Sequence, residues 1–160
     1  MINEQQADLF LFTGDLINSE KDEINPYLDI FSNIKAKHGK YAVLGNHDYY
    51  GFYNTGQDRS DSYWQDFMSK FKKMDFQLLN NENTHIIKDG EKIRLAGVEN
   101  WGAGRFFPKH GDLDLALQGV KKDEFTILMS HDPSHWDHHV LPHDKHIHLT
   151  LSCHTHGRCV

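Results

Sequence analysis

Four short stretches of this chain share one pattern, an apolar run followed at once by residues that can bind metal ions. The runs are bounded by glycine or polar residues and are rich in Leu, Phe and Val, which is typical of buried β-strands. In an open α/β sheet, the residues after the carboxyl ends of the strands gather at one edge, so these polar side chains are expected to converge. The stretches are LFLFTGD ending at Asp15, YAVLGNHD ending at Asp48, FTILMSHD ending at Asp132 and LTLSCHTHG ending at Gly157.

The segments between the four runs alternate between helical and extended patterns, which predicts an α/β fold. Residues 22–37 carry apolar side chains at helical spacing and are expected to form a crossover helix between two strands. Residues 60–74 predict a second helix, with Asp61 as its cap and an aromatic stripe that packs in the core. The other predicted elements are a hairpin over residues 84–100 that turns at Asp89 and Gly90, strands at 76–80, 125–130 and 146–152, and helices at 113–117 and 133–141.

The composition fits one globular domain over residues 1–160. Apolar residues make up 38% of the chain, which is adequate for a core at this length. The 17 basic and 23 acidic residues leave a net charge of -6 without a Lys/Arg block, so there is no electrostatic case for binding nucleic acid. No apolar run of membrane-spanning length and no signal-peptide pattern occurs, so we expect a soluble chain with no membrane segment.

The polar residues at the strand ends have the chemistry of a metal centre that hydrolyses phosphate esters. Such hydrolysis needs a hydroxide at neutral pH and positive charge near the phosphoryl oxygens, and two divalent ions about 3.5–4 Å apart meet both needs. Carboxylate, amide and imidazole ligands without thiolate suit manganese, iron or zinc. Asp15 is the natural bridge between the two ions. The residues expected to complete the shells are Asn46, His131 and His154 for one ion and His156 for the other.

Four motifs carry a resemblance to a known family: FTGDLIN, LGNHDYY, MSHDPSHWDHHV and LSCHTHG, in this order over residues 8–157. Together they resemble the calcineurin-like metallophosphoesterases. The resemblance implies an α/β sandwich of two mixed β-sheets flanked by helices, with a dinuclear centre at the strand ends and the ligand roles given above. It also implies that His47 contacts the phosphate and protonates the leaving oxygen. Asn18 or Asp48 would orient this histidine.

The chain departs from the family pattern at both ends. The family normally opens with a strand that carries a DxH motif, and no DxH precedes Asp15. We therefore expect the first strand and helix to be missing, which leaves one ion with two protein ligands, Asp15 and His156. Cys153 stands where the family usually has glycine, so strain or crowding is expected there. Family strands expected after the last motif are missing too, and the sequence is interpreted as partial.

The remaining histidines and the cysteines receive weaker assignments. His135 and His139 have the i, i+4 spacing of a helical metal pair, but no acidic third ligand is evident, so a solvated or supporting face is favoured. Cys153 and Cys159 are too few and too local for a disulfide framework and are expected to be free thiols. Exposure suffices to explain His143, His146 and His148, and no role is given to His38, His85 and His110.

The stretch WGAGRFFPKHG, residues 101–111, is typical of a loop. Gly102 and Gly104 lack the flanking strand, the helix and the third glycine of a phosphate-binding loop, so a turn is the better interpretation. Two alternatives remain for the loop's large side chains. They either reach the mouth of the site, with Arg105 as a phosphate contact, or pack in the core. The residues concerned are Trp101, Arg105, Phe106 and Phe107.

These observations predict a metal-dependent phosphoesterase that hydrolyses a phosphomonoester or phosphodiester with a hydroxide bridging two divalent metal ions. The alternative is a catalytically inactive metal-binding or interaction domain of the same fold, with one ion as a structural clasp. A small phosphorylated substrate is expected in the first case. The cytoplasm is the default location, but relatives of this type sometimes carry membrane segments, so membrane association of a full-length protein stays open.

Overall fold

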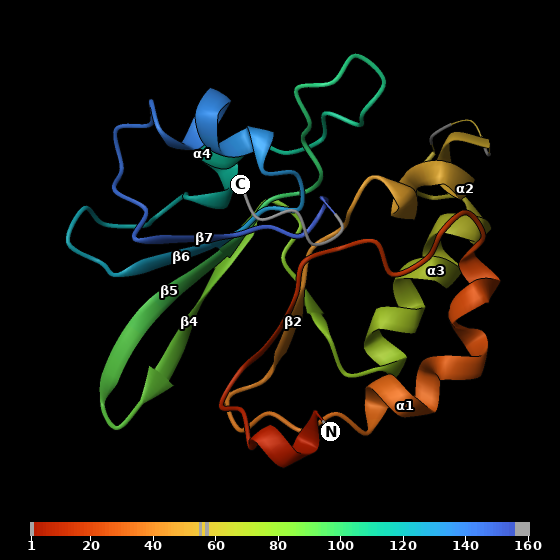
Figure 1. The fold of residues 1–160 in the computed structure, drawn as a ribbon, viewed down its shortest axis with the longest axis horizontal. Helices are drawn as coiled ribbons and strands as arrows, with labels where there is room; N and C mark the ends of the chain where they lie inside the picture. Colours follow the sequence, from red (N-terminus) through yellow and green to blue (C-terminus); the bar gives the residue numbers. More distant parts are fainter. Residues whose placement is uncertain (1, 55, 57, 156–160) are drawn as a thin grey trace.

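The strands of the computed structural model, which describes residues 2–54, 56 and 58–155, form two β-sheets (Figure 1). The smaller sheet has the order β1-β2-β3, and both of its strand pairs are parallel. The larger sheet has the order β4-β5-β6-β7 and is mixed, since its first pair is antiparallel and the other two are parallel. The strands are β1 Phe10–Phe12, β2 Lys40–Ala42, β3 Gln77–Leu78, β4 Glu82–Lys88, β5 Glu91–Gly97, β6 Thr126–Met129 and β7 Leu149–Leu151.

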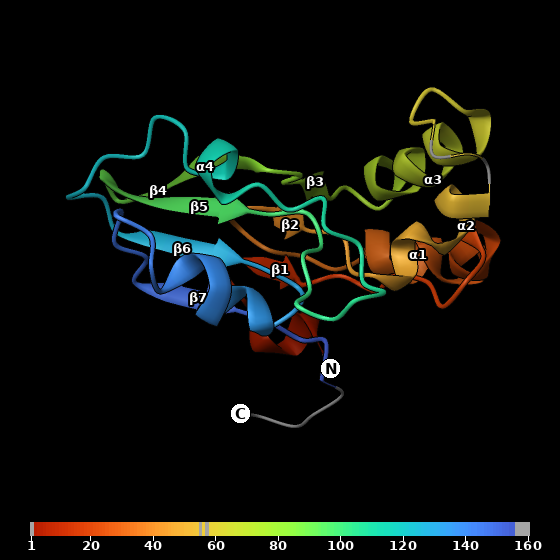
Figure 2. The same ribbon diagram turned by 90° about the horizontal axis from the view of Figure 1, so that it is seen from above.

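Helices cover the outer face of each sheet (Figures 1 and 2). The helices α1, α2 and α3 lie beside the smaller sheet, whereas α4 and the π-helix η4 lie against the larger one. The predicted α/β sandwich is therefore confirmed, although the described part of the smaller sheet is parallel rather than mixed. The helical segments are η1 Asn3–Gln5, η2 Lys21–Tyr27, α1 Leu28–Ser32, η3 His47–Tyr49, α2 Tyr50–Asn54, α3 Ser62–Lys73, α4 Leu113–Ala116 and η4 Trp136–Val140.

Side chains along β2 and the residues after it alternate between two apolar cores, because successive strand residues point to opposite faces. Tyr41 and Val43 pack between the two sheets, whereas Ala42 and Leu44 pack against the helices of the smaller sheet. A shift of one residue would exchange the two sets, so this pattern fixes the register of β2. The larger sheet has its own outer core, which contains Ala96, Leu128, Leu117 and Val140.

The predicted single helix over residues 22–37 is wrong in form and length, although the segment does cross over between the parallel strands β1 and β2. It consists of the 3₁₀-helix η2 followed by the five-residue α1. Pro26 lies inside η2 and lacks the N–H that a continuous α-helix needs. The last carbonyls of α1 accept hydrogen bonds from Nζ of the buried Lys40 at 3.1 and 3.3 Å. Tyr27 and Ile30, two of the apolar residues at helical spacing in this segment, are exposed.

The helix α3 agrees with the prediction for residues 60–74. The Asp61 carboxylate caps its start and accepts a backbone N–H at 2.7 Å. Trp64, Phe67 and Phe71 are buried in the core beside the smaller sheet. The expectation that this aromatic stripe packs in the core is therefore confirmed.

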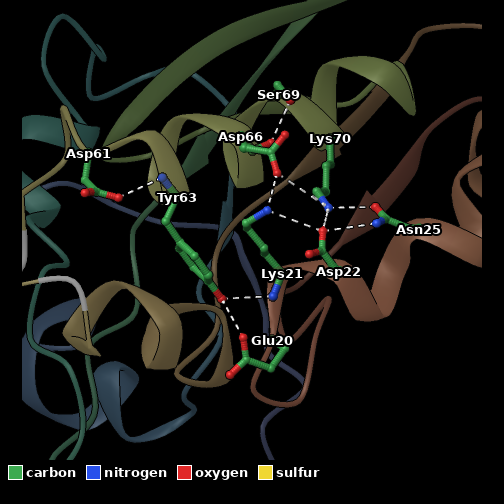
Figure 3. A network of polar contacts seen from close by, with 9 residues as sticks. All are labelled: Glu20, Lys21, Asp22, Asn25, Asp61, Tyr63, Asp66, Ser69 and Lys70. Carbon is green, nitrogen blue, oxygen red and sulfur yellow. Dashed lines mark hydrogen bonds and ion pairs between the residues drawn. The ribbon is translucent and has the colours of Figure 1, made fainter.

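A polar network joins η2 to α3 (Figure 3). The buried Lys70 of α3 places Nζ 2.7 Å from Asp22 Oδ1 and 2.6 Å from Asn25 Oδ1. Lys21 Nζ lies 2.6 Å from Asp66 Oδ2. The hydrogen bond from Lys70 is the main reason why the pKa of Asp22 falls to about 2. The network therefore fixes the crossover segment on the helical layer.

The other predicted elements are present in shorter form. The β4–β5 hairpin turns at Asp89 and Gly90, whose φ angles of 53° and 85° are those of the predicted two-residue turn. The helix expected at 113–117 is α4, and the helix expected at 133–141 is reduced to the π-helix η4. Among the described residues, none of the helices has the length and apolar character needed to cross a membrane.

Candidate metal centre

Three of the predicted ligands lie together where strands of both sheets end. Asp15 follows β1 of the smaller sheet, and His131 and His154 follow β6 and β7 of the larger sheet. One donor atom from each of these residues lies within 4.8 Å of the other two. The structure thus brings residues that are more than 100 positions apart in sequence to one point between the sheets.

The buried ring of His131 has a different partner at each nitrogen. Nδ1 lies 2.7 Å from the carbonyl oxygen of Thr13, and because a carbonyl only accepts, Nδ1 carries the proton. Nε2 lies 3.2 Å from Asp15 Oδ2 and 3.1 Å from His154 Nδ1. Burial acts against a charged ring, but the hydrogen bond to Asp15, the charge of that carboxylate and the hydrogen bond to Thr13 together outweigh it, so the pKa of His131 is raised. In the neutral ring, Nε2 offers its lone pair to a cation.

The backbone after β1 is shaped so that the Asp15 carboxylate enters this centre. Gly14 and Asp15 have positive φ angles of 101° and 59°, and the second is uncommon for a residue with a side chain. A Cβ on Gly14 would lie 2.5 Å from Gly45 N and 2.8 Å from His131 Nδ1, and a Cβ on Gly45 would overlap the Asp15 carboxylate. The strand ends approach this closely because both positions lack a side chain. Burial acts to raise the pKa of Asp15, but the hydrogen bonds from His131 and His47 and the charges of these two histidines together lower it overall.

Asp48 fastens the loop after β1 to the loop after β2. Its buried carboxylate accepts the backbone N–H groups of Asp15 and Gly45 at 2.9 and 2.8 Å. It also accepts those of Leu16 and Ile17 at 2.8 and 3.3 Å. Burial raises the pKa of Asp48 to about 7, because removal from water penalises the charged form. The carboxylate therefore holds backbone groups in place, including that of a candidate ligand, rather than the neighbouring histidine ring.

His47 opens η3 and contacts both the candidate ligand Asp15 and the chain after it. Its backbone N–H donates to Asp15 Oδ1 at 3.0 Å. Its ring Nδ1 lies 2.7 Å from the carbonyl oxygen of Asn18, so Nδ1 carries a proton. Asn18 thus contacts the ring through its main chain, since its side chain donates to Ser19 Oγ. The Tyr50 ring packs edge-on against this imidazole, with centroids 4.8 Å apart.

Asn46 provides the observation that fits a metal ion best. It is 2% exposed, and its Oδ1 has no hydrogen-bond partner among the described residues. A buried polar atom left unpaired costs about 1–3 kcal/mol, so a ligand for it is expected. Its neighbours Gly45 and His47 both lie against the Asp15 carboxylate. A carboxylate, an amide oxygen and two imidazoles suit manganese, iron or zinc, so these residues fit the divalent ion that the sequence predicts.

Two predictions concern the last motif of the chain. His156, the predicted ligand of the other ion, lies outside the described residues, as does Cys159. Cys153 is a free and exposed cysteine, and its φ angle is not in the left-handed region. Its N–H donates to the carbonyl of His131 at 3.2 Å. The expected backbone strain at Cys153 is therefore wrong, because this position needs no glycine, and the side chain is exposed.

His135 and His139 are not part of the ligand cluster found among the described residues. His135 is buried, and its Nδ1 lies 3.0 Å from Ser130 Oγ. Burial lowers the pKa of His135 to about 4, so this ring is neutral at pH 7. His139 is exposed, and its ring meets that of Trp101 edge-on at 4.4 Å. These contacts explain both rings by packing and exposure and not by a shared metal ion.

The loop over residues 101–111 reaches the centre through Phe107, whose ring meets the His154 ring edge-on with centroids 5.1 Å apart. Phe106 is 92% exposed, and Arg105 is exposed too. A residue without a predicted role also reaches His154: the Oδ2 atom of Asp132 lies 3.9 Å from its Nε2. The signal that could have identified Asp132 is its place directly after a predicted ligand.

Comparison with known proteins gives concordant matches. A family model described as calcineurin-like phosphoesterase matches residues 1–158. An uncharacterized metallophosphoesterase of Helicobacter pylori is 29% identical over 156 residues, which cover 98% of this chain and 38% of the relative. A transmembrane protein with metallophosphoesterase domain from Bos taurus is 32% identical over 166 residues, covering 98% and 35%. An uncharacterized metallophosphoesterase of Bacillus subtilis is 29% identical over 159 residues, covering 98% and 49%. The chain thus spans half or less of each of these three relatives.

Proposed function

We propose that this chain, which belongs to the calcineurin-like phosphoesterase family, forms the metal-binding and catalytic part of a phosphoesterase. The proposed reaction is hydrolysis of a phosphomonoester or phosphodiester by a hydroxide held between two divalent ions of manganese, iron or zinc. The observation that carries the proposal is the convergence of Asp15, His131 and His154, near which the buried Oδ1 of Asn46 has no hydrogen-bond partner in the described part of the chain. The chain spans 38% of the length of the Helicobacter relative. The activity of a longer protein that contains this chain is therefore proposed as well.

The chain's own contacts prepare the ligands for an ion. The Thr13 carbonyl keeps the proton of His131 on Nδ1, and Asp48 holds the backbone from which Asp15 extends. A divalent ion at this point would neutralise charge on the phosphoryl oxygens and make hydroxide available at neutral pH. The proposed ligands are Asp15, Asn46, His131 and His154 for one ion, and Asp15 and His156 for the other.

His47 is the proposed source of the proton for the leaving oxygen. Its Nδ1 donates to the Asn18 carbonyl in the neutral ring and in the charged ring, so this contact orients both forms. The charged ring has a second N–H, on Nε2, which it can give to the leaving oxygen. The backbone bond from His47 to Asp15 keeps this acid beside the proposed ion. General acid catalysis of this kind contributes about 100- to 10,000-fold to a rate.

A small phosphate ester, rather than a nucleic acid, is the proposed substrate class. The net charge of -6 gives no sequence-independent attraction for a polyanionic backbone. The proposed ions would act on the phosphate group and not on the group attached to it. Generic aryl phosphates therefore serve as probes of the reaction.

The proposal is tested by ion content and turnover of the purified chain. Protein stripped with a chelator is reloaded with Mn²⁺, its ions are counted by elemental analysis, and hydrolysis of p-nitrophenyl phosphate and its bis ester is measured. His47→Ala is expected to keep the ions and to lose about 100-fold or more in turnover. His131→Ala is expected to lose an ion. His146→Ala removes an exposed histidine and is expected to behave as wild type.

Each other outcome changes the conclusion. Unchanged turnover in His47→Ala would contradict the proposed acid. Bound ions without any turnover in the wild type would favour the catalytically inactive metal-binding domain. Absence of bound ions would contradict both functions.

A further inference from the structure

The buried carboxylate of Asp132 holds a fixed position beside the candidate metal centre. Asp132 is 5% exposed. Its Oδ1 accepts the backbone N–H of Ser134 at 2.9 Å and the hydroxyl of the same residue at 2.6 Å. Its Oδ2 lies 3.9 Å from His154 Nε2. One oxygen is therefore anchored by Ser134, and the other faces a candidate ligand.

The two nitrogens of His154 face different groups. Nδ1 lies 3.1 Å from His131 Nε2 within the ligand cluster, whereas Nε2 faces Asp132. A neutral histidine binds a metal through one nitrogen while its proton stays on the other. Ligand histidines usually donate that second N–H to a carboxylate or carbonyl, which fixes the tautomer and the ring orientation. The Thr13 carbonyl has this position for His131, and Asp132 has the equivalent position for His154.

The loop over residues 101–111 is built around this carboxylate. The N–H of Ala103 donates to Ser134 Oγ at 2.9 Å, which ties the loop to the residue that anchors Asp132. A Cβ on Gly102 would lie 2.5 Å from Asp132 Oδ2, so the loop can pass here only where a side chain is lacking. Gly102 is thus explained by the room that it leaves for a carboxylate and not by phosphate binding.

We propose that Asp132 is a positioning residue that accepts a hydrogen bond from the Nε2–H of His154 and so keeps the Nδ1 lone pair available for a divalent ion, an inference that rests on the proposed function. The ring of Phe107 packs edge-on against the ring of His154, with centroids 5.1 Å apart and an interplanar angle of 85°. This contact limits rotation of the His154 ring. The separation of 3.9 Å is about 1 Å longer than a hydrogen bond, and binding of the ion is expected to close it.

Ion affinity of Asp132→Asn tests the proposal. Loss of such a partner typically weakens metal affinity about 10- to 100-fold, and we expect the dissociation constant for Zn²⁺ to rise by that factor in competition with a chromophoric chelator. Asp114→Asn is the matched control, because it removes the same charge from a side chain that is 95% exposed. It is expected to leave the affinity unchanged.

The outcomes separate this inference from the proposed function. If the wild type binds Zn²⁺ and turns over phosphate esters in Mn²⁺ while Asp132→Asn binds Zn²⁺ as tightly, the positioning role is overturned and the function stands. Equal weakening in Asp132→Asn and Asp114→Asn would reduce the effect to charge alone and overturn the role too. A wild type that binds no Zn²⁺ would overturn both.

A second measurement needs no substitution at Asp132. Nitrogen-15 NMR of the Zn²⁺-loaded wild type, labelled in its histidines, reports which nitrogen of His154 carries the proton, and His154→Ala identifies the resonance. We expect the proton on Nε2 and the ion on Nδ1. A proton on Nδ1 would overturn the proposal even if Asp132→Asn did not fold.

Discussion

Asp48→Ala is expected to lower the free energy of unfolding by about 4 kcal/mol, because one carboxylate satisfies several buried N–H groups. Three of its four contacts are short, at 2.8, 2.8 and 2.9 Å, and the fourth is 3.3 Å. Each buried donor left unpaired costs about 1–3 kcal/mol, and water that enters the space of the lost side chain keeps the total near the lower end. Small domains are stable by about 5–15 kcal/mol, so this loss is a large fraction of the whole.

Urea unfolding at pH 6, below the pKa of about 7 for Asp48, measures this loss, because at higher pH the buried charge itself costs stability that Asp48→Ala would relieve. Asp112→Ala is the matched control, because that carboxylate caps α4 with one bond to Leu115 N–H at 2.9 Å and its loss is expected to cost about 1 kcal/mol. Asp48→Asn keeps one acceptor oxygen and is expected to fall between the two. A cost of Asp48→Ala no greater than that of Asp112→Ala would refute the reasoning.

Two further predictions concern charged side chains outside the centre. Lys40→Met is expected to lower the free energy of unfolding by about 2 kcal/mol. The buried Nζ donates to the Met74 carbonyl at 2.6 Å and to the last carbonyls of α1, and these acceptors would lose their partner. An unchanged urea midpoint would contradict this prediction. Hydrogen bonds from His85, the Lys121 backbone and Arg94 lower the pKa of Glu124 from 4.5 to about 2, so its contribution to stability is present above about pH 4.5 and is lost as the pH falls towards 2. The difference in urea midpoint between wild type and Glu124→Gln is expected to shrink over that range, and a constant difference would argue against this.

The strand-end pattern was sufficient for an α/β fold and for three converging residues, whereas the sandwich of two sheets was expected only from the family resemblance. Asp15, His131 and His154 each follow a short apolar run that forms a parallel-paired strand. Ends of parallel strands lie at one edge of their own sheet, and the two sheets bring these edges together at the cluster. The convergence therefore did not depend on the helices, whose bounds the sequence predicted less well.

Buried charges could not be predicted from local sequence. Lys40 and Lys70 are 3% and 2% exposed, although lysine is usually a surface residue. Lys70 is neutralised by Asp22, which lies 48 positions away, and such partners leave no mark in a local pattern. Burial of Lys40 also helps to end α1 early, whereas Pro26 was a visible reason to expect a broken helix.

The surroundings of the candidate ligands depend on loops rather than on periodicity. Asp48 was one of two residues expected to orient the His47 ring, the other being Asn18, but it binds backbone N–H groups of loops that meet only in the folded chain. Asp132, which follows β6, faces His154 beside the loop over residues 101–111, and these segments are far apart in sequence. Hydrophobic pattern fixes strands, and it carries no information on such contacts.

Anomalous diffraction at the zinc edge, from crystals of the chain grown with Zn²⁺, tests the metal centre most directly. We expect a strong peak about 2.0–2.2 Å from His131 Nε2, His154 Nδ1 and an Asp15 oxygen, with Asn46 Oδ1 in the same shell. No peak at this position, or a peak that leaves Asn46 and His154 outside its shell, would contradict the proposed centre.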